Sequence, residues 1–163
     1  MLHLFPHWNW EQREGEPISV WVHSNLDPVE LFLNGKSQGS QKLQPLTHLE
    51  WKVPYAPGVL EARGTKDGKI VLVAKRETTG KPESIRLTAD QTEISADGKD
   101  VAVLRVEVLD KEGRAVPTVD NMINFKVTGE GALIGVGNGD PNCQESDKEP
   151  RRSLFNGLAW LAC

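Results

Sequence analysis

The sequence of 163 residues has little cysteine: Cys143 and Cys163 are the only two. Two cysteines are too few for a disulfide-stapled scaffold or for a cysteine-rich zinc site. Because Cys163 ends the sequence and chain ends fray, we expect both thiols to stay unpaired. The fold must then depend on an apolar core, and a content of 38% hydrophobic and 26% charged residues is typical of a soluble globular protein.

Long apolar runs and basic clusters are also missing. No stretch approaches the roughly 18 apolar residues that span a bilayer, and Pro6 lies where a signal peptide would need an apolar segment. We therefore expect no membrane partner, with any export signal outside this chain. The 19 Lys and Arg residues are spread among 23 Asp and Glu residues. Without a basic run to neutralise phosphates, a nucleic-acid partner is not expected.

Motifs for catalysis and metal binding are absent or lie in the wrong context. His3 and His7 are four residues apart, which is about 13 Å in an extended segment and too far for one metal ion. GKSQG (35–39) matches Gly-x-Ser-x-Gly, but a nucleophile elbow needs a strand before it and a helix after it. GVGNGDP (135–141) lacks the helix that would hold a phosphate. We predict no catalytic residue, no cofactor and no metal site.

Apolar residues alternate with a period of two, and no stretch of eight or more residues keeps a helical period. The sequence therefore predicts an all-β protein. In PISVWVHS the three aliphatic residues face a core, whereas Trp21 and His23 point away. VELFLNG likewise directs Phe32 outward before an Asn-Gly hairpin turn, and HLEWKVPY places Trp51 in the core.

A long hairpin is predicted in GVLEARGTKDGKIVLVAKRE, where Asp67-Gly68 supplies the turn. Counting outward from this turn pairs Ala62 with Val73. The same register buries Val71 and Val73 on the inner face.

TTGKPES (78–84) interrupts the strands near the middle of the sequence. We therefore predict two domains, 1–79 and 83–163, each an immunoglobulin-like β-sandwich. The second domain is expected to be truncated, because the sequence stops inside an apolar strand. The strand at 158–161 would then lack a neighbour, which predicts that this half is less stable or pairs with another copy of the chain.

Four segments together resemble the C-terminal region of bacterial β-galactosidases of glycoside hydrolase family 2, and this resemblance spans essentially the whole chain. They are HLFPHWNW, PVELFLNGKSQG, HLEWKVPYAPGVLEARGTKDGK and VEVLDKEGRAVPTVDNMINFKVTGEGALIGVGNGDP. In that family such regions are accessory β-sandwiches that follow a catalytic (β/α) barrel. The second half is also similar to invasin-type bacterial immunoglobulin-like domains, through ISADGKDVAVLRVEVLDKEGRAVP.

The resemblance implies a noncatalytic fragment of a β-galactosidase that supports or positions the absent barrel. The two catalytic glutamates of the family belong to the barrel, one of them in an Asn-Glu pair, and this sequence has no Asn-Glu dipeptide. We expect the chain to be inactive alone and its parent to be periplasmic or secreted. A carbohydrate-binding or adhesin-type module is the alternative. The expected partners are the barrel, a carbohydrate, or a second copy of the chain.

HLFPHWNW concentrates tryptophan and histidine in a chain with only 6% aromatic residues. Its rings could pack against another domain, within the first sandwich, or against a sugar, since flat rings fit the apolar face of a pyranose. The outward Trp21 and Phe32 would extend the same patch. The predicted residues of carbohydrate or interdomain contact are His7, Trp8, Trp10, Trp21 and Phe32.

Overall fold

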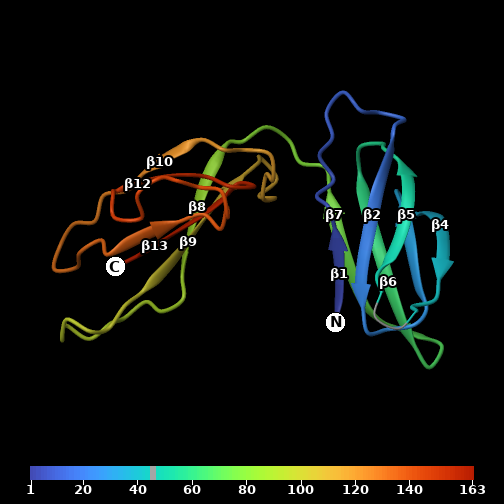
Figure 1. The fold of residues 1–163 in the computed structure, drawn as a ribbon, viewed down its shortest axis with the longest axis horizontal. Helices are drawn as coiled ribbons and strands as arrows, with labels where there is room; N and C mark the ends of the chain where they lie inside the picture. The colour runs from blue at the N-terminus through green and yellow to red at the C-terminus, as the bar shows by residue number, and fades with distance from the viewer. Residues whose placement is uncertain (45–46) are drawn as a thin grey trace. The chain divides into compact units, whose positions relative to one another are not determined.

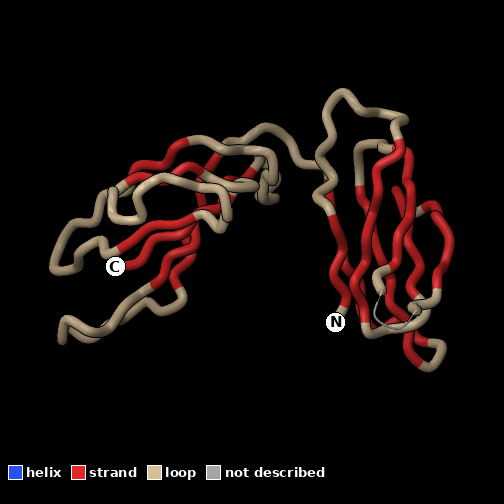
Figure 2. The backbone as a smooth tube through the Cα atoms, in the orientation of Figure 1, coloured by secondary structure: helices blue, strands red, loops and turns tan. Residues whose placement is uncertain are grey.

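The structure, a computed structural model, describes residues 1–44 and 47–163 and divides into two compact units, Met1–Thr78 and Thr79–Cys163. The described residues form strands joined by turns and loops, without a helix (Figure 2). The predicted all-β class is thereby confirmed. Accordingly, no helix capable of crossing a membrane occurs in the described part of the chain.

Unit 1 is a sandwich of two antiparallel sheets (Figure 1). One sheet has the order β1 (Leu2–Phe5), β2 (Pro17–Ser24) and β5 (Leu49–Pro54). The other has the order β4 (Lys36–Gln41), β3 (Val29–Leu33), β6 (Val59–Lys66) and β7 (Lys69–Glu77). Both sheets contribute their inward side chains to a single core.

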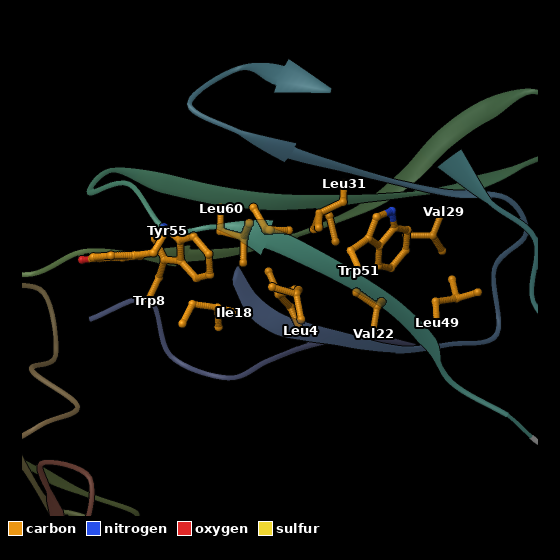
Figure 3. Close-up of a cluster of buried hydrophobic side chains, with 13 residues drawn as sticks. Leu4, Trp8, Ile18, Val22, Val29, Leu31, Leu49, Trp51, Tyr55 and Leu60 are labelled. Atoms are coloured by element: carbon orange, nitrogen blue, oxygen red, sulfur yellow. The ribbon is translucent and has the colours of Figure 1, made fainter. Parts of the chain in front are cut away.

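The core of unit 1 follows the alternation of the sequence. The three aliphatic residues of PISVWVHS are buried, and Trp51 is buried opposite them, as predicted. Burying one large aliphatic side chain contributes about 1.5–3 kcal/mol, so this alternation largely decides which face of each strand is covered. Trp8 and Tyr55 lie beside each other and close one end of the core (Figure 3).

The hairpin of β6 and β7 has a different register from the predicted one. The residues next to the turn pair as expected, but the register shifts by one residue beside Gly64. Ala62 then pairs with Ala74 rather than with Val73. Val71 and Val73, which we predicted to be buried, are 47% and 49% exposed. The shift is a β-bulge, and a one-residue slip turns the following side chains to the opposite face.

Unit 2 packs a four-stranded antiparallel sheet against a two-stranded one. The larger sheet has the order β11 (Gly135–Gly137), β13 (Leu158–Ala162), β9 (Val103–Leu109) and β8 (Ser84–Ala89). The smaller sheet contains β10 (Met122–Asn124) and β12 (Arg151–Ser153). Val106, Val136 and Leu161 of the larger sheet share a core with Leu154, which follows β12.

The narrow second sheet leaves part of unit 2 uncovered. Ile85 and Leu87 of β8 pair with the buried Val108 and Val106, and directly paired residues point to the same face of a sheet. Even so, Ile85 and Leu87 are 56% and 58% exposed. A cleft of about 450 Å³ runs beside Ile85, and Val108 and Ile123 also line it.

The strand at the end of the sequence is not an unpaired edge. β13 lies between β9 and β11 and pairs with both. The prediction that the strand at 158–161 lacks a neighbour is therefore wrong, because the short β11 takes the place that the sequence pattern left empty. The edge strands of this sheet are β8 and β11. Cys143 and Cys163 are both free thiols, as predicted.

Candidate functional site

Trp8 is one of the five predicted contact residues, and it is fully buried in the core of unit 1. Its indole Nε1 donates a hydrogen bond to the Ala56 carbonyl oxygen at 3.0 Å, and its ring meets Tyr55 edge to face with centroids 5.2 Å apart (Figure 3). The Thr78 hydroxyl donates to the Trp8 carbonyl oxygen at 2.7 Å. A ring without exposed surface cannot contact a sugar or another domain. The prediction of a contact role for Trp8 is therefore wrong, and its role is to fill the core.

Trp10 and His7 form a small stack of their own beside the core. Their rings are 4.6 Å apart and inclined by 25°, and the Trp10 indole N–H donates to the His7 carbonyl oxygen at 3.1 Å. The Arg13 guanidinium lies 5.3 Å from the centre of the Trp10 ring. Burial lowers the pKa of His7, which keeps its imidazole neutral at pH 7. Much of the Trp10 ring is thus covered from within unit 1.

Trp21 lies on the outer face of the β1–β2–β5 sheet, in a group of five rings that we call the aromatic face: His3, Phe5, Trp21, His23 and His48. The register of β1 and β2 sets Phe5 opposite Trp21 and His3 opposite His23. Along the row His3–Phe5–His23–His48–Trp21, successive ring centroids are 4.1, 5.7, 5.6 and 4.5 Å apart. Phe5 and Trp21 are 42% and 44% exposed. The sheet therefore presents a continuous row of rings to solvent.

Polar groups border this row on the side of β5. Trp21 pairs with Glu50 and Ser19 with Lys52, so all four side chains share the outer face. The Trp21 indole N–H donates to the Ser19 hydroxyl at 3.2 Å, and Ser19 in turn donates to the Glu50 carboxylate. The hydrogen bonds from Ser19 and Trp21 lower the pKa of Glu50. This relay fixes the indole in place and keeps an ionised carboxylate at its edge.

Phe32 does not extend the aromatic face. It belongs to β3 in the other sheet of the sandwich, whereas Trp21 belongs to β2. Each points outward from its own sheet, so the two residues lie on opposite outer faces. The guanidinium of Arg63 lies 4.1 Å from the centre of the Phe32 ring and covers it in part. The prediction that Phe32 and Trp21 form one patch is wrong, because alternation gives the direction of a side chain but not the sheet to which its strand belongs.

Sequence reasoning missed most of the aromatic face. His3 and Phe5 alternate along one short strand, a signal that could have paired them, and His23 follows Trp21 by two residues. Alternation could not assign His48 to this group. The residue directly precedes β5, and its place beside Trp21 depends on how β5 pairs with β2. Of the five predicted contact residues, only Trp21 belongs to this group.

The arrangement is suited to binding rather than to bond cleavage. Hydrolysis of a glycoside requires a pair of carboxyl groups, about 5–10 Å apart, on either side of the scissile bond, whereas the polar border of the aromatic face supplies Glu50 alone. Ser37 of the GKSQG stretch lies in β4, and its hydroxyl donates to Glu30 at 2.6 Å. Among the described residues, no group of three or more His, Cys, Asp or Glu side chains could hold a metal ion.

Comparison with known proteins shows where such a chain occurs. Residues 85–162 match the model of glycoside hydrolase family 2 C-terminal domain 5, and residues 15–72 match a domain of unknown function, DUF4982. The beta-galactosidase BoGH2A of Bacteroides ovatus is 45% identical over 96% of this chain, which corresponds to 18% of that protein. A beta-glucuronidase of Formosa agariphila is 33% identical over 86% of this chain and 15% of its own length.

A solved structure agrees with these sequence matches. A beta-glycosidase from Bacteroides vulgatus superimposes with a TM-score of 0.92 at 35% identity, over 99% of this chain and 21% of that one. This chain thus spans about a fifth of the length of the proteins that it matches. The family match, the sequence identities and the shared fold together show that this chain belongs to glycoside hydrolase family 2, in the C-terminal region of its enzymes.

Proposed function

We propose that this chain is a noncatalytic accessory region of a β-galactosidase and that it supports and positions the catalytic barrel of its parent enzyme. The observation that carries this proposal is the match of nearly the whole chain to about a fifth of a beta-galactosidase, at 45% identity. The aromatic face adds a second line of support, because it offers apolar surface without a catalytic pair of carboxylates.

The aromatic face is the surface that we assign to the contact with the rest of the parent. Exposed aromatic clusters mark interaction sites more often than scattered single rings do. The hydrogen bonds from Trp21 to Ser19 and from Ser19 to Glu50 hold the indole in one orientation. A preformed ring loses little conformational entropy on docking, so the contact gains more of the free energy of burial.

Two measurements test this function. The isolated chain should not release product from an aryl β-galactoside, and turnover by the pure chain would overturn the noncatalytic assignment.

In the parent enzyme, Trp21→Ala should shorten the half-life of activity near the inactivation temperature several-fold, because a docked aromatic anchor contributes about 2 kcal/mol or more to an interface. Trp160→Ala is the matched control, since Trp160 is 41% exposed in unit 2. Equal half-lives for both variants would contradict a docking role for the aromatic face.

Carbohydrate binding is the second candidate function, and the border of the aromatic face favours it. A pyranose can stack its C–H face on Trp21 or Phe5, while Glu50 and Lys52 hydrogen-bond its hydroxyl groups. The test is retention of the chain by immobilised β-galactan. Binding that Trp21→Ala abolishes and Trp160→Ala preserves would support this function. Absence of retention in the wild-type chain would exclude it.

A further inference from the structure

Arg152 in β12 carries a buried positive charge in unit 2. The residue is 4% exposed. Its Nη2 donates to the Val136 carbonyl oxygen at 3.1 Å, but its Nε is buried without a hydrogen-bond partner. A buried guanidinium destabilises the fold unless an anion or a good acceptor compensates its charge. The surroundings of Arg152 must therefore supply negative charge.

The nearest carboxylate gives only part of this compensation. Glu145 lies 4.0 Å from the Nε of Arg152, which is beyond hydrogen-bond distance. Both of its oxygens are already engaged by Ser153, one by the backbone N–H at 2.9 Å and one by the hydroxyl at 2.5 Å. These hydrogen bonds, together with the charge of Arg152, lower the pKa of Glu145. The carboxylate is ionised at pH 7 but does not reach the guanidinium.

The sulfur of a free cysteine contacts the third nitrogen of the Arg152 guanidinium. The Nη1 of Arg152 donates to the Sγ of Cys143 at 2.8 Å. A turn holds the backbone of Cys143, because the Cys143 N–H donates to the Asp140 carbonyl oxygen at 3.2 Å and the Asn142 N–H to the Asp140 carboxylate at 2.9 Å. Cys143 is a free thiol and the residue is partly exposed.

We propose that Cys143 is a reactive thiol and an oxidation site, activated by the buried guanidinium of Arg152. A thiol attacks electrophiles as its thiolate, and an adjacent cation stabilises the negative charge on sulfur. With a hydroperoxide, the sulfur attacks one peroxide oxygen and the O–O bond breaks. With hydrogen peroxide the products are a sulfenic acid on Cys143 and hydroxide, so sulfur loses two electrons and the peroxide gains them. The Nη1–H of Arg152, which donates to the sulfur, is the donor closest to the added oxygen.

Cys163 provides an internal comparison within the same chain. It is also a free and partly exposed thiol, and its backbone pairs with Ala102 in both directions. Among the contacts of the described residues, none joins its sulfur to a guanidinium. The two thiols are therefore in the same solution and are both partly exposed, but only Cys143 lies beside a positive charge.

The test measures the modification of both cysteines in the intact chain by iodoacetamide and, separately, by hydrogen peroxide, with mass spectrometry of the two peptides. At pH 7, Cys143 should react about tenfold faster than Cys163 or more, because a neighbouring cation raises the reactivity of a thiol. In concentrated urea the two rates should become equal. Equal rates in the folded chain, or a slower Cys143, would overturn the proposal.

Two variants connect the reactivity to Arg152. Arg152→Met should reduce the rate of Cys143 to that of Cys163, provided that its thermal transition shows a folded unit 2. Glu145→Gln decides the question even if Arg152→Met unfolds, because Glu145 is at the surface and glutamine keeps an acceptor for Ser153. Removing this negative charge should raise the rate of Cys143 several-fold and leave Cys163 unchanged. A rate of Cys143 that Glu145→Gln does not raise would overturn the electrostatic origin of its reactivity.

Discussion

Asp110 shows how single residues stabilise unit 2. Its buried carboxylate accepts hydrogen bonds from the backbone N–H groups of Gly80, Glu112 and Arg114 at 2.8, 3.0 and 2.9 Å. The Arg114 guanidinium adds contacts at 2.8 and 2.6 Å. Burial raises the pKa of Asp110, but the hydrogen bonds from Arg114 and Gly80 outweigh it and hold the pKa well below its usual range. The folded state therefore strongly favours the ionised carboxylate.

Asp110→Asn should lower the free energy of unfolding of unit 2 at pH 7, because the amide loses the charge that compensates Arg114. Since folding depresses this pKa, the stabilisation is complete above the unfolded value of about 3.9 and decreases as the pH falls below it. The difference between wild type and variant should therefore be constant from pH 7 to 5 and shrink toward pH 3.

Chemical denaturation at these pH values measures the effect of Asp110→Asn. The control is Asp120→Asn, which removes an exposed carboxylate of the same unit. If Asp110→Asn lowers the free energy of unfolding by as much at pH 3 as at pH 7, the stabilising role of the ionised Asp110 carboxylate is contradicted.

The tryptophans show what can be predicted for single residues. Trp21 and Trp51 lie in strands, where alternation correctly directs one outward and the other inward. Trp8 lies beyond the end of β1, where the chain has no period from which a direction could be read. Its burial depends on Ala56 and Tyr55, about 48 residues along the chain. The candidate site was therefore predictable at Trp21 and not at Trp8.

At the scale of elements, the hairpin of β6 and β7 decides which valines matter for stability. The β-bulge beside Gly64 leaves Val71 and Val73 about half exposed on the outer side. Val71→Thr and Val73→Thr should each change the free energy of unfolding by less than about 0.5 kcal/mol. Leu31→Ala in β3, where the side chain is fully buried, should cost about 2–5 kcal/mol.

Urea unfolding of these variants of unit 1 distinguishes the two registers. In the register without a bulge both valines face the core, and each Thr substitution would then bury an unpaired hydroxyl at a cost of about 1–3 kcal/mol. Losses of that size would show that the hairpin has the unbulged register.

The bulge also explains why this hairpin was only half predictable. The Asp67-Gly68 turn and the pairing next to it follow from local turn chemistry. The extra residue in β7 does not, because turn chemistry sets only the pairs beside the turn and the register shifts farther along the hairpin. In unit 2, the pairing of β13 with β11 was missed for a related reason: β11 has three residues, too few for a period to be recognised.

At the scale of the whole molecule, the two units differ in how completely they bury their cores. Thirteen described residues form the buried cluster of unit 1, and seven form that of unit 2. The inner face of β8 remains exposed at Ile85 and Leu87. The expectation that the second half is less stable therefore stays a prediction, but its reason is an uncovered sheet face and not an unpaired β13.

Hydrogen exchange of the intact chain measures this difference in one sample. Backbone amides in the interior of β2 and β5 should exchange more slowly than those of β9 and β13, because a smaller core gives a lower free energy of opening. Equally slow exchange in both pairs of strands would show that the larger core of unit 1 confers no advantage.

The sequence by itself determined the all-β class, the inward and outward faces of most long strands and the hairpin turns. These properties are local, because they depend on a period of two and on residues that accept turn conformations. The resemblance to family 2 enzymes rests separately on four segments of the sequence taken together. Only the tertiary structure decided that Trp8 is core, that Trp21 joins His3, Phe5, His23 and His48, and that Cys143 meets Arg152. Each of these contacts joins different segments of the chain, and the free energy of packing whole sheets selects them.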